Sequence, residues 1–233
     1  MAIRSKTSLR TAWKESEAVV RAMGDGKQFL LLSRASTDPG FTEARLLQHH
    51  LEFFLLPDPE STRREEIRPE FHSYLDGESD NNGQQVTLRY RAIVTEATMV
   101  MEPAQLRDLA PFHIWTDEYV RRQTRWDPHD PTYLVTCKVQ RVDPPPAVAF
   151  REEYRKQGPW VEIDEDLPPV SFEEVVPHND YLKVAIDVKK ALAELQKNPM
   201  ERPAPEAEAP PAPAAAATAP AKPDAGTPAG TAS

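Results

Sequence analysis

The chain has 233 residues and a formal net charge of −9, from 28 Lys and Arg against 37 Asp and Glu, and 39% of its residues are hydrophobic. The single cysteine, Cys137, excludes an internal disulfide framework and a zinc site built from several thiolates. No run reaches the roughly 18 apolar residues of a membrane span, and no apolar signal segment follows the basic start. These features predict a cytoplasmic protein that does not contact membranes. The acidic total also argues against a general nucleic-acid coat, although it permits a local basic groove.

Proline and alanine dominate the C-terminal end of the chain. Residues 197–233 contain almost no large apolar side chain, so they cannot bury enough surface to offset their loss of conformational entropy. We therefore expect a flexible N-terminus at residues 1–8, one globular domain at 9–196 and a disordered tail at 197–233. The tail is a candidate tether and a candidate contact for a protein partner.

The first elements are predicted as a helix and two buried strands. Helical spacing of large residues indicates a helix from Ser8 to Met23, ended by Gly24 in a left-handed cap. Short apolar runs at 28–34 and 51–56 predict strands that pair in one sheet. The residues of the expected helical stripe are Leu9, Trp13, Ser16, Val20 and Met23.

The middle of the chain alternates weak helices, turns and strands. Residues 62–75 are weakly helical, and 76–83 form a polar loop. The segment 85–102 fits one bent strand or two short ones, and Pro103 begins a short helix that Pro111 closes.

The remaining elements complete an α+β pattern. Thr116 is expected to cap a helix that has acidic residues in its first turn and arginines in its last. Strands are expected at 132–139 and 160–163, and a final helix begins at Asp180. Strands and helices do not alternate regularly, so we predict a mixed sheet or half-open barrel flanked by helices.

Several kinds of chemistry are excluded or disfavoured. The chain lacks a phosphate-binding loop and a Gly-x-Ser-x-Gly elbow, and Cys137 within a strand is expected to be an inert buried thiol. The histidines lack the spacing of a helical ligand pair, so we predict neither a metal nor another cofactor.

Two groups of residues remain as candidate sites. One joins Lys14 and Glu15 in the first predicted helix to Arg34; its alternative is a solvated helix face. The other is the segment 112–126, where arginines alternate with aromatic residues in an otherwise acidic chain. Arginine forks suit phosphate and aromatic rings stack on bases, so this segment predicts an anion site. Its alternative is a helix packed through its rings, with the arginines paired to carboxylates.

The order of five sequence blocks resembles an uncharacterised bacterial family of domains of unknown function. The blocks span residues 12–15, 29–34, 50–57, 113–119 and 159–163, and they include a Leu-Leu-Leu-x-Arg motif at 30–34 and His-Ile-Trp-Thr at 113–116. The sequence departs from the family where Trp13 precedes Lys14, and where Ala35 and Ser36 replace glycines. The resemblance implies an association with restriction-modification-like DNA metabolism and supplies no catalytic residue.

We predict a module that binds nucleic acid or another anionic ligand. One alternative is an enzyme acting on nucleic acid or a modified nucleotide, with Glu15 or Glu52 as acid-base and His113 as proton shuttle. A further alternative is an interaction scaffold tethered by its tail. The predicted ligand-binding residues are Lys14, Glu15, Arg34, His113, Trp115, Thr116, Tyr119, Arg122 and Trp126.

Overall fold

The computed structural model describes residues 9–34, 51–61, 63–100, 103–125, 131–156 and 158–197. The predicted flexible N-terminus, the tail beyond Lys197 and Trp126 lie outside these residues. In the described ranges, no helix is long and apolar enough to cross a membrane.

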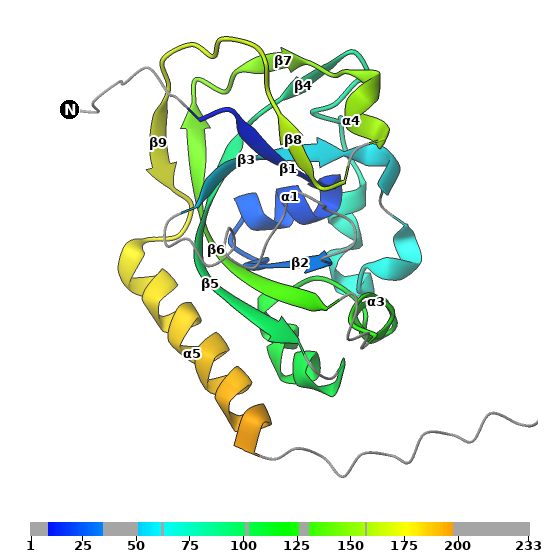
Figure 1. The fold of residues 1–233 in the computed structure, drawn as a ribbon, viewed down its shortest axis with the longest axis vertical. Helices are drawn as coiled ribbons and strands as arrows, with labels where there is room; N and C mark the ends of the chain where they lie inside the picture. Colours follow the sequence, from blue (N-terminus) through cyan, green and yellow to red (C-terminus); the bar gives the residue numbers. More distant parts are fainter. Residues whose placement is uncertain are drawn as a thin grey trace, which may run out of the picture. The chain divides into compact units, whose positions relative to one another are not determined.

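A mixed seven-stranded sheet forms the centre of the fold (Figure 1). Its strands follow the order β2-β6-β5-β3-β1-β8, and β9 pairs with the second half of β6. Among the described strands of this sheet, β1 and β3 are the one parallel pair. The bounds are β1 Thr11–Ser16, β2 Leu30–Arg34, β3 Glu52–Asp58, β5 Tyr90–Val100, β6 Thr132–Asp143, β8 Trp160–Glu162 and β9 Ser171–Glu174. A separate two-stranded sheet pairs β4 (Gln85–Thr87) with β7 (Ala147–Ala149).

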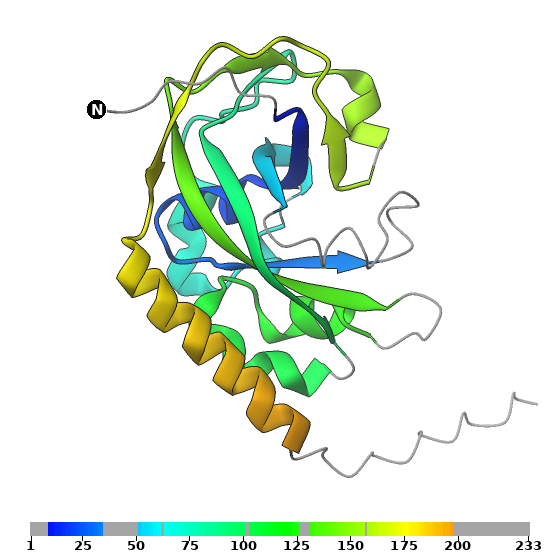
Figure 2. The same ribbon diagram turned by 60° about the vertical axis from the view of Figure 1, so that its left-hand side comes forward.

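Helices lie on both sides of the main sheet. Figure 1 shows α1 within the curve of the sheet and α5 along its outside, and Figure 2 shows the long strands β5 and β6 side by side. The helices are α1 Glu17–Gly24, α3 Asp117–Gln123, α4 Glu152–Lys156 and α5 His178–Lys197. The 3-10 helices are η2 Pro59–Ser61, η3 Arg64–Glu66, η4 Pro69–Leu75 and η5 Pro103–Phe112. The predicted α+β class, with an open mixed sheet flanked by helices, is confirmed.

The β1–β3 pair separates two hydrophobic cores. Because side chains alternate along a strand, Trp13 and Phe53 face one core while Ala12 and Phe54 face the other. All four are at most 1% exposed. Burial on both faces explains why β3 is a continuous apolar run without a polar side.

The predicted helix from Ser8 to Met23 is wrong in its first half. Thr11–Ser16 forms β1, and the helix begins only at Glu17. The large residues here have helical spacing, but backbone pairing with β3 on one side and β8 on the other keeps the segment extended. Tertiary pairing therefore overrides the local pattern.

Gly24 also differs from its prediction. It is the last residue of α1 and not a left-handed cap; the positive φ of 65° belongs to Gly26. A Cβ at Gly24 would lie 2.2 Å from Cζ of Tyr90, so any larger residue here would displace the ring of Tyr90.

Other sequence predictions are confirmed or corrected by the strand order. The strands at 30–34 and 52–58 share one sheet but do not pair, since β6 and β5 lie between them. The segment 85–102 is two strands, placed in different sheets. Cys137 is fully buried in β6, as predicted, and burial raises the pKa of its thiol.

Candidate functional site

The segment from His113 to Gln123 is fixed in place by η3. Trp115 forms an antiparallel bridge with Ile67, and the backbone N–H of Thr116 donates to the carbonyl of Glu66 at 2.9 Å. The hydroxyl of Thr116 then accepts from the N–H of Tyr119 at 3.3 Å, which confirms the predicted cap of α3.

His113 and Trp115 are buried, so the expectation that their rings face a binding groove is wrong. Each is 2% exposed, and their ring centroids lie 5.4 Å apart. Gln28 holds the segment against β2, because its side-chain oxygen accepts from the N–H of Ile114 at 2.7 Å. Trp115 continues into a contact with the half-buried ring of Tyr119, at 5.7 Å between centroids. These rings fill the core instead of presenting a face for stacking.

The arginines of this segment lie on the outside. Arg121, Arg122 and Arg125 are exposed, and Arg34 reaches them from the end of β2 by donating to the carbonyl of Arg125 at 3.3 Å. Arg122 forms an ion pair with Glu66 and lies 5.5 Å from the ring centroid of Tyr119. Within the described part of the chain, Arg121 and Arg125 make no ion pair. We call Arg34, Arg121, Arg122 and Arg125 the arginine patch.

Glu15 lies close enough to Glu66 and Tyr119 for their charges to interact, and its pKa is strongly raised. It is partly exposed, and its carboxylate accepts from the N–H of Ser16 at 2.9 Å. Burial raises its pKa to about 7, and the neighbouring charges of Asp58 and Glu66 act in the same direction. Tyr119 has a raised pKa for the same reasons, burial first and then the charges of Glu15 and Glu66. Glu15, Glu66 and Tyr119 thus form one electrostatic cluster.

Two other predicted residues do not join Glu15. Lys14 points to the opposite face of β1, where its ammonium donates at 2.6 Å to the carbonyl of Tyr154 in the short helix α4. Glu52 lies at the other end of β3, paired with Arg91 at 2.7 Å. Glu52 therefore lies away from Glu15, and His113, which is 2% exposed, does not open to solvent as the predicted proton shuttle requires.

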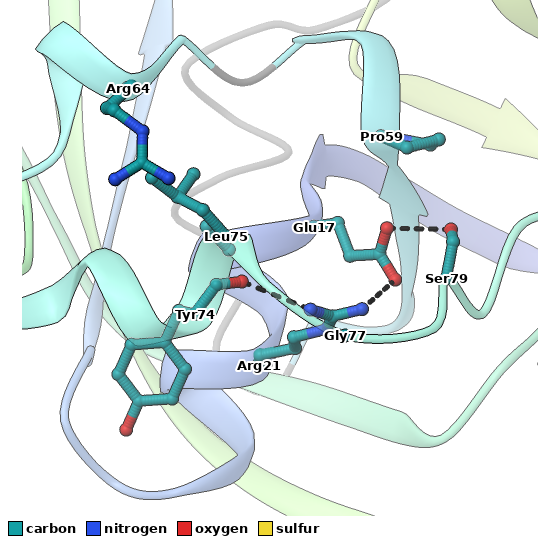
Figure 3. Close-up of a pocket in the computed structure, with 9 residues that line it drawn as sticks. Glu17, Arg21, Pro59, Arg64, Tyr74, Leu75, Gly77 and Ser79 are labelled. Carbon is teal, nitrogen blue, oxygen red and sulfur yellow. Dashed lines mark hydrogen bonds and ion pairs between the residues drawn. The ribbon is translucent and has the colours of Figure 1, made fainter.

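The sequence analysis missed a pocket beside α1. Its volume is about 350 Å³, and Arg64 faces it from the side opposite Glu17 and Arg21 (Figure 3). Its lining residues are Glu17, Ala18, Arg21, Pro59, Arg64, Tyr74, Leu75, Gly77 and Ser79. We call this the α1 pocket. The sequence signals were a polar loop at 76–83 and an amphipathic first helix, neither of which indicates a cavity alone.

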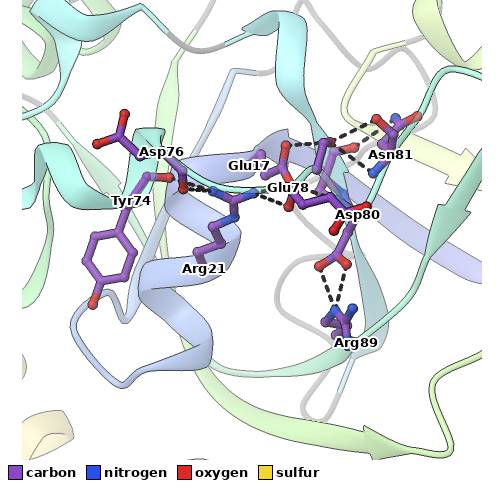
Figure 4. A network of polar contacts seen from close by, with 10 residues as sticks. Glu17, Arg21, Tyr74, Asp76, Glu78, Asp80, Asn81 and Arg89 are labelled. Carbon is purple, nitrogen blue, oxygen red and sulfur yellow. Dashed lines mark hydrogen bonds and ion pairs between the residues drawn. The ribbon is translucent and has the colours of Figure 1, made fainter.

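A polar network forms one wall of the α1 pocket (Figure 4). Glu17 is 7% exposed, and its carboxylate accepts from Arg21 at 2.9 Å, from the hydroxyl of Ser79 at 2.7 Å and from the N–H of Asp80 at 2.9 Å. Arg21 also donates to the carbonyls of Tyr74, Asp76 and Glu78. These bonds fasten the 76–83 loop to α1.

A neighbouring pocket of about 320 Å³ shares Pro59 and Ser79 with the α1 pocket. Its cation, Arg155, is held by Glu60 and by Glu152. Over the residues that the structure describes, no group of three or more His, Cys, Asp or Glu side chains could hold a metal ion.

A family model described as a domain of unknown function, DUF1802, matches residues 12–186. The chain belongs to this family. The match runs from β1 into the first half of α5 and therefore includes the arginine patch and the α1 pocket. The resemblance seen in the sequence to a family of unknown function is confirmed.

Two solved structures are similar to the DUF1802 chain, both of an ASCH protein from Zymomonas mobilis. A point mutant aligns with 8% identity and a TM-score of 0.36, covering 79% of this chain and 98% of that one. The other structure aligns with 8% identity and a TM-score of 0.34, covering 76% and 93%. At these TM-scores the likeness carries no argument. No curated protein matches the chain.

Proposed function

We propose that this DUF1802 domain binds nucleic acid through the arginine patch. The observation that carries the proposal is the meeting of β2 and α3, where the side chain of Arg34 bonds to the backbone of Arg125. This contact places Arg34 beside the C-terminal end of α3, where Arg121, Arg122 and Arg125 follow in sequence, in a chain whose net charge is −9. Guanidinium forks match phosphate geometry, and exposed arginines retain their charge for a ligand.

The proposed interface consists of arginine side chains and lacks the aromatic rings that the sequence predicts in it. Arg34 and Arg122 remain in it, Arg121 and Arg125 are added, and the buried rings of His113 and Trp115 serve only to position α3. An interface made of guanidinium groups without exposed rings contacts phosphates more than bases. We therefore expect weak dependence on sequence and strong dependence on salt. The single buried Cys137 supports a reducing compartment, and we place the protein in the cytoplasm.

Titration of labelled single- and double-stranded oligonucleotides at two salt concentrations tests the proposal. Replacing both Arg121 and Arg125 by alanine should weaken binding about tenfold or more and lower the salt slope by about 2, since two phosphate contacts are lost. The matched control removes two positive charges elsewhere, Arg151→Ala with Lys156→Ala, and should have little effect. Absence of binding at low salt, or equal losses in the two double variants, would contradict the proposal.

Glu15 favours a second candidate function, an enzyme acting on nucleic acid or a modified nucleotide. A carboxyl group with a pKa of about 7, close to a second carboxyl group, Glu66, that pairs with Arg122, has the properties of a general acid. If this is correct, the protein should convert a labelled oligonucleotide to products, and Glu15→Gln should reduce the rate about 100-fold or more without weakening binding. Intact oligonucleotide after long incubation with the native chain would exclude it for the substrates used.

A further inference from the structure

We propose that the α1 pocket binds a small hydroxylated phosphate monoester, of the nucleoside monophosphate class, with Arg64 holding the phosphate group. This site is separate from the arginine patch and does not depend on nucleic-acid binding there. Four features of the pocket support the proposal: its size and walls, the positioning of Arg64, the engagement of Arg21 and the remaining acceptor of Glu17.

The pocket is large enough for such a ligand and has an apolar wall for its organic part. Its volume of about 350 Å³ falls within the range of about 300–1,000 Å³ for small-molecule sites. Ala18, Pro59 and Leu75 provide apolar lining, while Arg64 lies across the pocket from Glu17 and Arg21 (Figure 3). The ring of Tyr74 points away from this space.

Arg64 is positioned but not neutralised. His72 lies 3.1 Å from its guanidinium through Nδ1, and its Nε2 lies 2.9 Å from the carbonyl of Ile67. A carbonyl only accepts, so Nε2 carries the proton and Nδ1 accepts from Arg64. The acid nearest to Arg64 is Asp76, at 3.7 Å, and both side chains are largely exposed. Such a pair is weak, and Arg64 keeps donors for a phosphate.

The other cation of the pocket is already engaged. Arg21 is bound by Glu17 and by three backbone carbonyls, so it holds the loop and leaves anion binding to Arg64. Glu17 accepts three hydrogen bonds, two at Oε1 and one at Oε2. Its two oxygens provide about four acceptor positions, which leaves one for a ligand hydroxyl. A phosphate monoester that carries hydroxyl groups can bind both Arg64 and the remaining acceptor position of Glu17, whereas a simple anion binds only Arg64.

Binding of adenosine 5′-monophosphate to the full chain, followed by calorimetry or by NMR, tests the proposal. Arg64→Met should weaken binding about tenfold or more, because it removes the charge and keeps most of the side-chain length. The control is Arg63→Met, which makes the same charge change at an exposed neighbour that does not line the pocket. Adenosine, which lacks the phosphate, and inorganic phosphate, which lacks the organic part, should each bind at least about tenfold more weakly.

Further arms separate the possible sources of the ligand. If the site takes a strand end, a 5′-phosphorylated oligonucleotide should bind more tightly than its 5′-hydroxyl counterpart, and Arg64→Met should remove the difference. If it takes a free nucleotide, the two oligonucleotides should bind equally. The Arg121→Ala, Arg125→Ala variant should bind adenosine 5′-monophosphate normally, so failure of the patch leaves this test intact. Equal losses in the Arg64 and Arg63 variants, or no saturable binding by about 10 mM, would overturn the proposal.

Discussion

The α3 segment and the α1 pocket place their charges in opposite ways. In the α3 segment the rings are inside and the arginines outside, so Trp115 packs in the core while Arg121 and Arg125 face solvent. In the α1 pocket charged groups are inside, and Glu17 and Arg21 are bonded to each other and to the 76–83 loop. Contiguous residues form the first region, whereas the second collects residues from α1, η2, η3, η4 and the loop.

A segment with a conspicuous amino-acid composition therefore does not by itself form a concave binding site. A stretch rich in arginine and aromatic residues sorts itself by burial, because rings gain free energy in the core and guanidinium groups lose it there. A pocket requires elements that come together only after the sheet has formed. Substitutions in each region show whether the two regions also differ in how much their side chains contribute to the free energy of unfolding.

The largest effect is expected for Trp115→Ala. Removing a ring that is 2% exposed should lower the free energy of unfolding by about 3–5 kcal/mol, measured by chemical denaturation. The control Met99→Ala, at a side chain that is 40% exposed, should change it far less. A loss below about 1 kcal/mol for Trp115→Ala would show that the ring is a surface feature after all.

Glu17→Gln tests the interior charges of the pocket. An amide offers one acceptor oxygen where Arg21, Ser79 and the N–H of Asp80 now donate, so at least one donor loses its partner. We expect unfolding to become easier by about 2–4 kcal/mol, measured by urea denaturation. Glu118→Gln, an exposed position on α3, is the control and should stay within about 0.5 kcal/mol. Equal effects would remove the distinction between the two regions.

Glu15 should make stability depend on pH. Its pKa is raised from 4.5 to about 7 in the folded chain, so between these values the folded state holds a proton that the unfolded state has lost. The stability from this group is complete below about pH 4.5 and is lost as the pH rises through about 7. Relative to Glu15→Gln, the native chain should lose roughly 3 kcal/mol across this window. A difference that does not change with pH would contradict the raised pKa.

The smallest effect on stability is expected for Arg121→Ala with Arg125→Ala. Both side chains are exposed, so the free energy of unfolding should change by less than about 0.5 kcal/mol per residue. Thermal and chemical unfolding measure this directly. A larger loss would mean that the arginines stabilise the fold, and a loss of oligonucleotide binding could then not be assigned to direct contact.

Local sequence pattern correctly predicts a helix cap and several buried positions, but it does not predict the strand β1. Thr116 caps α3 as expected, because the cap depends on atoms within three residues. Cys137 and the apolar side of α5, including Tyr181 and Val188, are buried as their spacing indicated. By contrast, the spacing of Leu9, Trp13 and Ser16 predicts a helix, whereas Thr11–Ser16 forms the strand β1. The partner strand β3 lies about 40 residues away, so the local pattern does not reveal the pairing.

Amino-acid sequence was enough to predict the family, the α+β class, the capped helix α3 and the accumulation of arginine near it. These depend on composition and on neighbours within a few residues. Three features became visible in the folded chain alone: Trp115 is core, Lys14 and Glu15 face opposite sides of β1, and a pocket opens between α1 and the 76–83 loop. Burial and concavity arise from contacts between segments distant in the chain. Local spacing of residues does not indicate which segments will come into contact.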